Sequence, residues 1–294
     1  MYIGGYPRQL RYYRASSLSH ALELLSEVGE EGKVIAGGQS LMPMMRLRMS
    51  FLNNLIDIYG INELRYVKID GNTLKIGALT THQEIAMDPT IARNMPMLTR
   101  AAWTIADLQV RNRGTIGGSL AHADPAANYL PALMVADAEL SIIDKAGQRR
   151  VRLSNFMLDS YTTDIKPSEL VAEVDIPLDR YNAFGYSILK RGGNAFPIVI
   201  AAVAAKVGNG VVHEARLGVG GITAKPLLIE LNDIEGKSIG DALNSAQRSI
   251  DASIDESIKG TRLLSDIHAS DRYRLGAAKS FSLEAVKSAL GGRS

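Results

Sequence analysis

Two glycine-rich turns carry the residues most suited to chemistry in this chain. The first turn links a short apolar run to helix-favouring residues; with its flanks it comprises Val34, Ile35, Ala36, Gly37, Gly38, Gln39, Ser40 and Leu41. The second turn has the same order of residue types and comprises Thr115, Ile116, Gly117, Gly118 and Ser119. Glycines let backbone amides approach an anion closely, and a helix N-terminus adds partial positive charge. Two such turns can hold one pyrophosphate from two sides, which is the chemistry of dinucleotide binding.

Other phosphate-binding motifs do not match the sequence. Neither turn contains G-x-G-x-x-G, and GVGG at residues 218–221 follows an antiparallel strand pattern without a ribose-binding acid at the expected offset. The lysine spacing of a P-loop is also absent. A lone glycine pair is usually just a turn, but two turns of the same composition favour a ligand site.

Composition excludes several classes of function. The chain has no cysteine, which excludes disulfides, thiolate nucleophiles, iron–sulfur ligation and cysteinyl attachment of a cofactor. The five histidines lack the spacing of a metal site, and no nucleophile elbow is present. The net charge of +2, without a dense basic block, gives no support to nucleic-acid binding, and the basic stretch at residues 11–14 is interpreted as solvated or at an interface. Without a signal-peptide pattern or a long apolar run, we expect a cytoplasmic protein with no membrane span.

The elements that must position the two turns read as an α+β protein. A serine cap and a glycine stop predict a helix within residues 16–29, and short strands are predicted at 33–36 and 54–58. Residues 66–69 and 73–76 bracket Asp70-Gly71-Asn72, which indicates a hairpin. Helices are then predicted at 80–86 and 96–106, and strands at 138–144, 149–153 and 170–176.

The pattern changes near residues 177–181. Long strands at 184–190, 198–207 and 211–218 are typical of an antiparallel meander, and helical periodicity returns at 239–250 and 275–290. A length of 294 residues suits two or three domains. We predict three, at residues 1–60, 61–177 and 178–294.

AGGQSL at residues 36–41 and TIGGSLAHADPAAN at 115–128 resemble the two flavin-contact motifs of a known family. This family is the FAD-binding medium subunits of molybdenum hydroxylases, the carbon monoxide dehydrogenase and xanthine dehydrogenase relatives. VRNRG at 110–114 and KRGGNAF at 190–196 also fit, and the resemblance covers the whole chain. It implies a PCMH-type FAD-binding fold of two lobes, similar to vanillyl-alcohol oxidase, followed by a β-then-α domain like that of the carbon monoxide dehydrogenase flavoprotein. The implied cofactor is non-covalently bound FAD.

The resemblance also implies individual roles. The amides of the first turn and the Ser40 hydroxyl would hold the pyrophosphate, and the second turn would hold its other side. Asp124 would face the ribose or flavin, although it could instead cap the helix after the following proline. Lys190 would contact the flavin edge, where a cation favours the anionic reduced flavin, unless it forms an exposed salt bridge. Ile105 and Leu170 would pack near the cofactor.

Four positions leave alternatives open. Ser119 stands where many relatives have asparagine, and Asn128 stands where relatives are often acidic. Phe196 lies one residue after the usual place of an aromatic, so it either covers the flavin or belongs to the core. His122 lies inside the second motif, and its role is open.

By this resemblance the chain is an electron-transferring subunit with no catalytic acid or base of its own. Its partners would be a small subunit with [2Fe–2S] clusters and a large subunit with the molybdenum cofactor, assembled as a dimer of heterotrimers. Because the chain lacks cysteine, the clusters must lie on another chain, and residues 42–48 are a candidate contact. The alternatives are a stand-alone FAD oxidase or reductase of the same fold, and a flavin-free assembly subunit. The hydroxylated substrate, the terminal electron acceptor and the oligomeric state of the isolated chain stay open.

Overall fold

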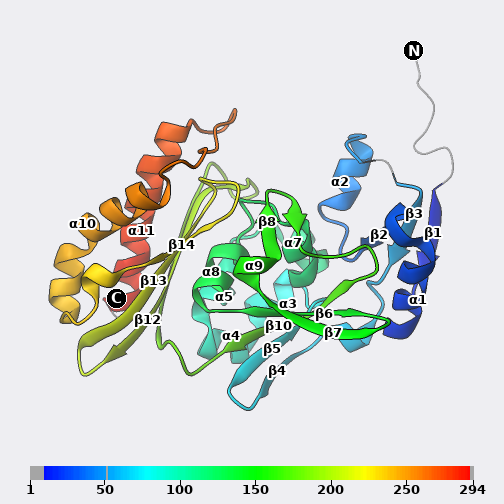
Figure 1. Ribbon diagram of the computed structural model, residues 1–294, viewed down its shortest axis with the longest axis horizontal. Coiled ribbons are helices and arrows are strands. Elements are labelled where there is room, and N and C mark those ends of the chain that lie inside the picture. Colours follow the sequence, from blue (N-terminus) through cyan, green and yellow to red (C-terminus); the bar gives the residue numbers. More distant parts are fainter. Residues whose placement is uncertain (1–9, 51, 292–294) are drawn as a thin grey trace.

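The structure is a computed structural model and describes residues 10–50 and 52–291. Three main sheets follow one another along the chain, from the N-terminal sheet through a middle region to the C-terminal sheet (Figure 1). In the described part of the chain, no helix is long and apolar enough to cross a membrane.

The N-terminal sheet is parallel and has the strand order β1-β3-β2. It consists of β1 (Arg11–Arg14), β2 (Gly32–Ile35) and β3 (Asn54–Asp57), accompanied by α1 (Leu18–Val28), the short helix η1 (Gly29–Glu31) and α2 (Leu41–Arg46). The predicted helix is confirmed: the Ser17 side chain accepts from the His20 amide at its start, and Gly29 ends it with φ of 56°. The treatment of residues 11–14 as a basic patch missed β1, which pairs with β3 through its backbone.

The middle sheet is antiparallel, with the order β4-β5-β10-β6-β7. Its strands are β4 (Val67–Asp70), β5 (Thr73–Gly77), β10 (Leu170–Pro177), β6 (Glu139–Asp144) and β7 (Gly147–Arg152). The predicted hairpin is confirmed as β4 and β5. The other elements of this region are η2 (Asn62–Leu64), α3 (His82–Met87), α4 (Pro89–Asn94), α5 (Pro96–Trp103), α6 (Leu108–Arg113), α7 (Ile116–His122), α8 (Tyr129–Val135), α9 (Leu153–Phe156), β8 (Met157–Asp159) and β9 (Thr162–Thr163).

The C-terminal sheet is the predicted antiparallel meander with one further strand. It contains β11 (Ala183–Lys190), β12 (Pro197–Gly208), β13 (Val211–Gly220) and β14 (Leu227–Glu230), in chain order. The short helix η3 (Asn232–Ile234), α10 (Ile239–Ser257) and α11 (Asp271–Leu290) follow. The two long helices were predicted, although α10 continues beyond the predicted end at residue 250.

The C-terminal sheet is covered on both faces, which explains the continuous apolar run of β12. On one face Ile200, Ala202 and Ala204 join the core of the middle region, where α8 packs against β12 and β13. On the other face Val199 and Val203 join a second core with α10 and α11, which lie along the outer side of the sheet (Figure 1). Strands buried on both faces lose the polar alternation of a half-exposed strand.

A network of ion pairs ties the middle region to the C-terminal sheet. Asp137 contacts both Arg180 and Arg216, and its backbone has a positive φ of 54°. Glu214 accepts a 2.6 Å bond from Arg180 and lies 3.7 Å from Arg216. Shared charges of this kind fix the approach of two packed units more firmly than isolated surface pairs do.

Candidate functional site

The two glycine turns, far apart in sequence, are in direct contact. A β carbon on Gly37 would lie 1.9 Å from the carbonyl oxygen of Arg113 and 2.8 Å from Cα of Gly114. A β carbon on Gly118 would lie 3.9 Å from Cβ of Ala36. Glycine at position 37 is therefore required by backbone that precedes the second turn, and the predicted convergence of the turns is what the structure has.

The first turn presents unpaired backbone donors. It joins the end of β2 at Ile35 to the start of α2 at Leu41, with Gly38 at φ of 73°. Among the described residues, no acceptor lies within hydrogen-bond reach of the backbone amides of residues 36–41. The Ser40 side chain makes no capping bond either. Most of these residues are at least partly exposed, so their amides are accessible to an anionic ligand, and a glycine turn before a helix is suited to bind one.

The second turn uses its first amides to bind its own protein. The Ile116 amide donates to the Thr80 carbonyl at 3.1 Å, and the Gly117 amide donates to the Ala78 carbonyl at 2.9 Å. A β carbon on Gly117 would lie 2.5 Å from Cβ of Ala78. These contacts attach the start of α7 to the loop between β5 and α3.

The remaining amides of the second turn close it on itself. The Gly118 amide donates to Oγ1 of Thr115 at 3.2 Å, and the Ser119 amide donates to the Thr115 carbonyl at 3.0 Å. Thr115 thus caps α7 and is buried. Gly118 is exposed and Ser119 is half-buried, whereas Thr115, Ile116 and Gly117 are buried.

A neutral histidine lies beneath the contact between the turns. The His82 amide donates to the Gly114 carbonyl at 2.9 Å, and a β carbon on Gly114 would lie 2.6 Å from Nε2 of His82. Nδ1 lies 3.1 Å from the hydroxyl of the buried Tyr129. Burial lowers the pKa of His82 to about 3, and the charge of Arg111 acts in the same direction. Sequence analysis found no role for this residue, since its partners are distant in the chain.

Lys190 and Ile105, both predicted at the flavin, lie in one neighbourhood. Nζ of Lys190 donates to the Thr104 carbonyl at 2.7 Å and also to the Gly193 carbonyl. In the residues that the structure describes, Lys190 has no carboxylate partner, so the salt-bridge alternative is wrong. Burial lowers the pKa of Lys190, and the Arg111 charge contributes. Ile105 is half-buried at the edge of the main core.

Asp124 has local partners on both carboxylate oxygens. Oδ1 accepts from the Ala126 amide at 2.8 Å, which is a bond of the capping kind predicted as the alternative role for Asp124. The segment that it caps is a turn that precedes α8. Oδ2 accepts from the Tyr161 hydroxyl at 3.3 Å. The ring centroids of His122 and Tyr161 are 5.2 Å apart, and burial lowers the pKa of His122. The three side chains form one cluster at the end of α7.

Three further predicted positions differ in exposure. Leu170 is 3% exposed and packs with Leu79 between the N-terminal sheet and the middle sheet, which leaves almost none of its side chain for a ligand. Phe196 is 70% exposed, so the core alternative for it is wrong. Asn128 is buried, and its Nδ2 donates to Oγ1 of Thr104 at 2.9 Å. Asn128 thereby supports the segment that precedes Ile105.

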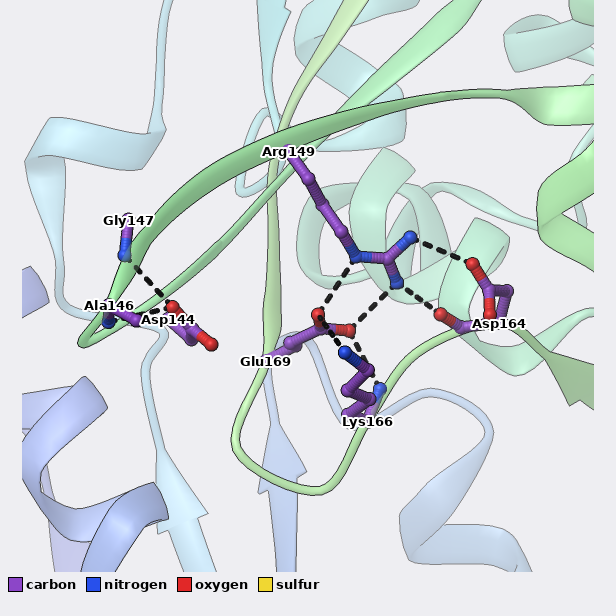
Figure 2. A network of polar contacts seen from close by, with 7 residues as sticks. All are labelled: Asp144, Ala146, Gly147, Arg149, Asp164, Lys166 and Glu169. Atoms are coloured by element: carbon purple, nitrogen blue, oxygen red, sulfur yellow. Dashed lines mark hydrogen bonds and ion pairs between the residues drawn. The ribbon is translucent and has the colours of Figure 1, made fainter.

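An ion-pair network that sequence analysis missed holds the chain that enters β10 at Leu170. Figure 2 shows Arg149 facing Glu169 and Asp164. Nε and Nη2 of Arg149 each lie 2.8 Å from a Glu169 oxygen, and Nη1 lies 2.7 Å from Oδ2 of Asp164. Arg149 holds the pKa of the buried Glu169 below its ordinary value. No local pattern signals this pairing, because the partners meet only when β7 folds beside the incoming loop.

The donor set fits the diphosphate of a dinucleotide. Among the described residues, the amides of residues 36–41 have no backbone acceptor, and Gly37 and Gly118 lie at the contact between the two turns. Successive amides in a glycine turn bind phosphate without a metal or a lysine. In residues 10–50 and 52–291 no group of three or more His, Cys, Asp or Glu side chains is placed to hold a metal ion.

Comparison with known families agrees with this geometry. Residues 8–179 match the family model described as FAD binding domain in molybdopterin dehydrogenase. Residues 184–289 match the model described as CO dehydrogenase flavoprotein C-terminal domain. The first match alone spans more than half of the chain.

Individual relatives are similar over most of their length. The glyceraldehyde dehydrogenase medium chain of Sulfolobus acidocaldarius is 34% identical, covering 96% of this chain and 99% of the relative. The carbon monoxide dehydrogenase medium chain of Hydrogenophaga pseudoflava is 38% identical over 70% of this chain and 73% of the relative. A solved structure of carbon monoxide dehydrogenase from Hydrogenophaga pseudoflava superposes with a TM-score of 0.89 at 30% identity, covering 98% of this chain and 99% of that one. The chain therefore belongs to the family of FAD-binding medium subunits of molybdenum hydroxylases.

Proposed function

We propose that this FAD-binding subunit takes electrons from [2Fe–2S] clusters on a small partner subunit and passes them to an external acceptor. The observation that carries the proposal is the row of amides at residues 36–41, which have no acceptor among the described residues and lie directly against the second turn at Gly37. A site built from amides and hydroxyls binds and orients a cofactor but supplies no acid or base. Electron transfer by FAD needs no such group from the protein.

Each part of the site has a distinct task in this proposal. Val34 and Ile35 at the end of β2 fix the position of the first turn. Residues 36–41 then hold the diphosphate through their amides. The second turn supplies Gly118 and Ser119 and acts as the wall against which the first turn rests. Ile105 and Lys190 flank the flavin ring, which supplies the redox chemistry when FAD is bound. Binding is non-covalent, and Asp124 and Leu170 support the site from its periphery.

Partner subunits follow from the family and from one exposed surface. The chain has no cysteine, so [2Fe–2S] clusters and the molybdenum cofactor would lie on a small and a large partner, in a dimer of heterotrimers. α2 stands apart from the N-terminal sheet (Figure 1), and Met42, Leu47 and Met49 on and after it are 42%, 72% and 69% exposed. Exposed large apolar side chains beside Arg46 are typical of a protein interface. We assign this surface to the iron–sulfur subunit.

The three-domain division is part of the same proposal. Residues 1–60 and 61–177 would form the two FAD-binding lobes, and residues 178–294 would form the C-terminal domain. The site lies where the first lobe meets the second, at Gly37 and Arg113.

Purification of the chain with FAD tests the cofactor assignment. We expect a yellow protein that holds stoichiometric FAD, and acid precipitation should release this FAD intact. Without partner subunits, no small organic substrate should reduce the bound FAD under anaerobic conditions. Reduction by such a substrate would instead favour a stand-alone oxidase or reductase. A colourless protein that gains no flavin absorbance would favour a flavin-free assembly subunit.

Charge reversal on α2 tests the partner surface. The variant Arg46→Glu with Arg48→Glu should weaken co-purification of the small subunit, while FAD content stays normal. Arg248→Glu on α10, an exposed arginine on the outer helix layer, is the matched control. Equal recovery of the partner with both variants would count against this surface.

A further inference from the structure

Two cations, Lys190 and Arg111, hold three consecutive carbonyl groups at the predicted flavin edge. Lys190 binds the Thr104 carbonyl at 2.7 Å. Nη1 of Arg111 binds the carbonyls of Ile105 at 3.0 Å and Ala106 at 3.2 Å. Hence the whole turn after α5 is oriented by this cation pair.

The turn includes a backbone conformation that is unusual for a residue with a β carbon. Ala106 has a positive φ of 34°, in a region that residues with a β carbon rarely adopt. A residue held there persists when its surroundings over-determine it, and such positions cluster at functional sites. The two carbonyl bonds from Arg111 on either side of this peptide provide that restraint.

Arg111 is itself held in one orientation. Nε donates to Oε1 of Gln83 on α3 at 3.1 Å, and the guanidinium lies over the Trp103 ring with Cζ 5.4 Å from its centroid. Its Nε and Nη1 serve Gln83 and the two carbonyls at once, in the fixed geometry of the guanidinium plane.

The cation pair has no negative partner. Among the ion pairs of the described residues, neither Arg111 nor Lys190 meets a carboxylate. Nearby Asp107 is engaged elsewhere, because its two oxygens accept from the Val110 amide and from Asn194. Part-buried cations that repel each other without a counter-ion are costly, and burial first, then the charge of Arg111, lowers the pKa of Lys190. A negative charge from a ligand would complete the arrangement.

We propose that Arg111 acts with Lys190 as an electrostatic receptor for the negative charge that the bound flavin gains on reduction, and that Arg111 also positions Ile105. This inference rests on the proposed function. Two electrons and one proton taken up by oxidised flavin leave one additional negative charge, which the cation pair stabilises. Arg111 therefore raises the reduction potential of the cofactor, and its removal makes reduction less favourable.

Redox titration of the FAD-loaded chain with dithionite tests this. In Arg111→Gln the ratio of reduced to oxidised flavin at a given potential should fall about tenfold, a shift of about 30 mV for a two-electron couple. Arg111→Lys keeps the charge and should recover most of that ratio. Arg248→Gln removes an exposed arginine on α10 and should leave the ratio unchanged.

The outcomes separate this inference from the proposed function. A flavin-loaded Arg111→Gln chain with the wild-type midpoint overturns the inference alone, whereas a wild-type chain that binds no FAD overturns the proposed function. If Arg111→Gln does not retain flavin, the midpoint reduction potential of the flavin in the wild-type chain tests the inference instead. It should lie above that of free FAD under the same conditions, and a value at or below that of free FAD overturns the inference.

Discussion

The two glycine turns share a composition and differ in what their amides do. In the first turn, the amides of residues 36–41 find no acceptor among the described residues. In the second, the amides of Ile116 and Gly117 are bound to the loop after β5, and those of Gly118 and Ser119 are bound to Thr115. The same motif can therefore either bind a ligand through its amides or attach one part of the protein to another. Which role a turn has depends on whether acceptors lie near its amides. We call residues 36–41 the grip and residues 115–119 the anchor, and the grip packs against the backbone that precedes the anchor.

Gly37→Ala should have the largest effect, because it forces the turns apart. Its β carbon would meet the Arg113 carbonyl oxygen at 1.9 Å, and that atom is backbone that cannot rotate away. We expect FAD affinity to fall at least about 100-fold, which corresponds to about 2.7 kcal/mol. Fluorescence titration with FAD measures this. Gly276→Ala on α11, where a β carbon meets no atom within 4 Å, is the control and should bind FAD normally. Normal FAD affinity in Gly37→Ala would contradict the contact.

Acidification should loosen the anchor through His82. Its pKa is about 3 in the folded protein, below the ordinary 6.5, so between these values the unfolded chain binds more protons and stability falls as pH falls. At pH 5 this amounts to about 2 kcal/mol relative to pH 7, since each pKa unit corresponds to about 1.36 kcal/mol. Urea unfolding at several pH values measures it. His82→Gln should flatten that dependence and the exposed His268→Gln should not, so equal slopes in the two variants would argue against this anchor.

Thr115→Val should damage the anchor but spare the grip. The substitution keeps the shape of the buried side chain and removes the acceptor of the Gly118 amide. Loss of a helix cap typically costs about 1 kcal/mol of stability. We expect a lower midpoint of thermal unfolding, with FAD affinity changed less than about threefold once folding is allowed for. A large loss of FAD affinity at unchanged stability would mean that the bond between Thr115 and the Gly118 amide is needed for ligand binding itself.

Ser40→Ala should do the converse, with the smallest effect. The Ser40 side chain makes no capping bond, so its removal should leave the free energy of unfolding unchanged within about 0.5 kcal/mol. Because the hydroxyl is a proposed donor to the diphosphate, FAD affinity should fall about fivefold, as for one hydrogen bond of about 1 kcal/mol. Isothermal titration beside thermal unfolding measures both quantities. A stability loss equal to that of Thr115→Val would remove the distinction between the turns.

Local patterns predicted much of the fold and misjudged some positions. The α1 helix, the β4–β5 hairpin and the C-terminal meander were foreseen because their caps, turn residues and alternation lie within a few residues of one another. The strand β1 was missed, because RYYR has no apolar alternation and becomes a strand through pairing with β3. Phe196 shows the same limit, since the sequence left open whether it is exposed and its exposure depends on neighbours far along the chain.

The family resemblance of the site was visible in the motif residues, but the hydrogen bonds and packing contacts around these residues were not. Both turns could be recognised from their residues, and the contact of Lys190 with the flavin stays a prediction. The roles of His82 and Arg111 could not be recognised, because their contacts with Gly114 and with the Thr104–Ala106 carbonyls depend on packing among α3, α5 and α6. Arg149 is a further case, with Glu169 brought to it by strand order.

The amino-acid sequence by itself determined where the chain can bend sharply, which segments alternate, and that no cysteine-bound cluster can form here. Backbone freedom at glycine, side-chain periodicity and thiol chemistry are properties of residues and short segments. Within residues 10–50 and 52–291, tertiary structure alone decided which turn has amides without an acceptor and which cations have no carboxylate partner. Those are properties of what lies within a few ångströms, and the acceptors Ala78 and Thr80 reach the second turn only after the sheets have packed.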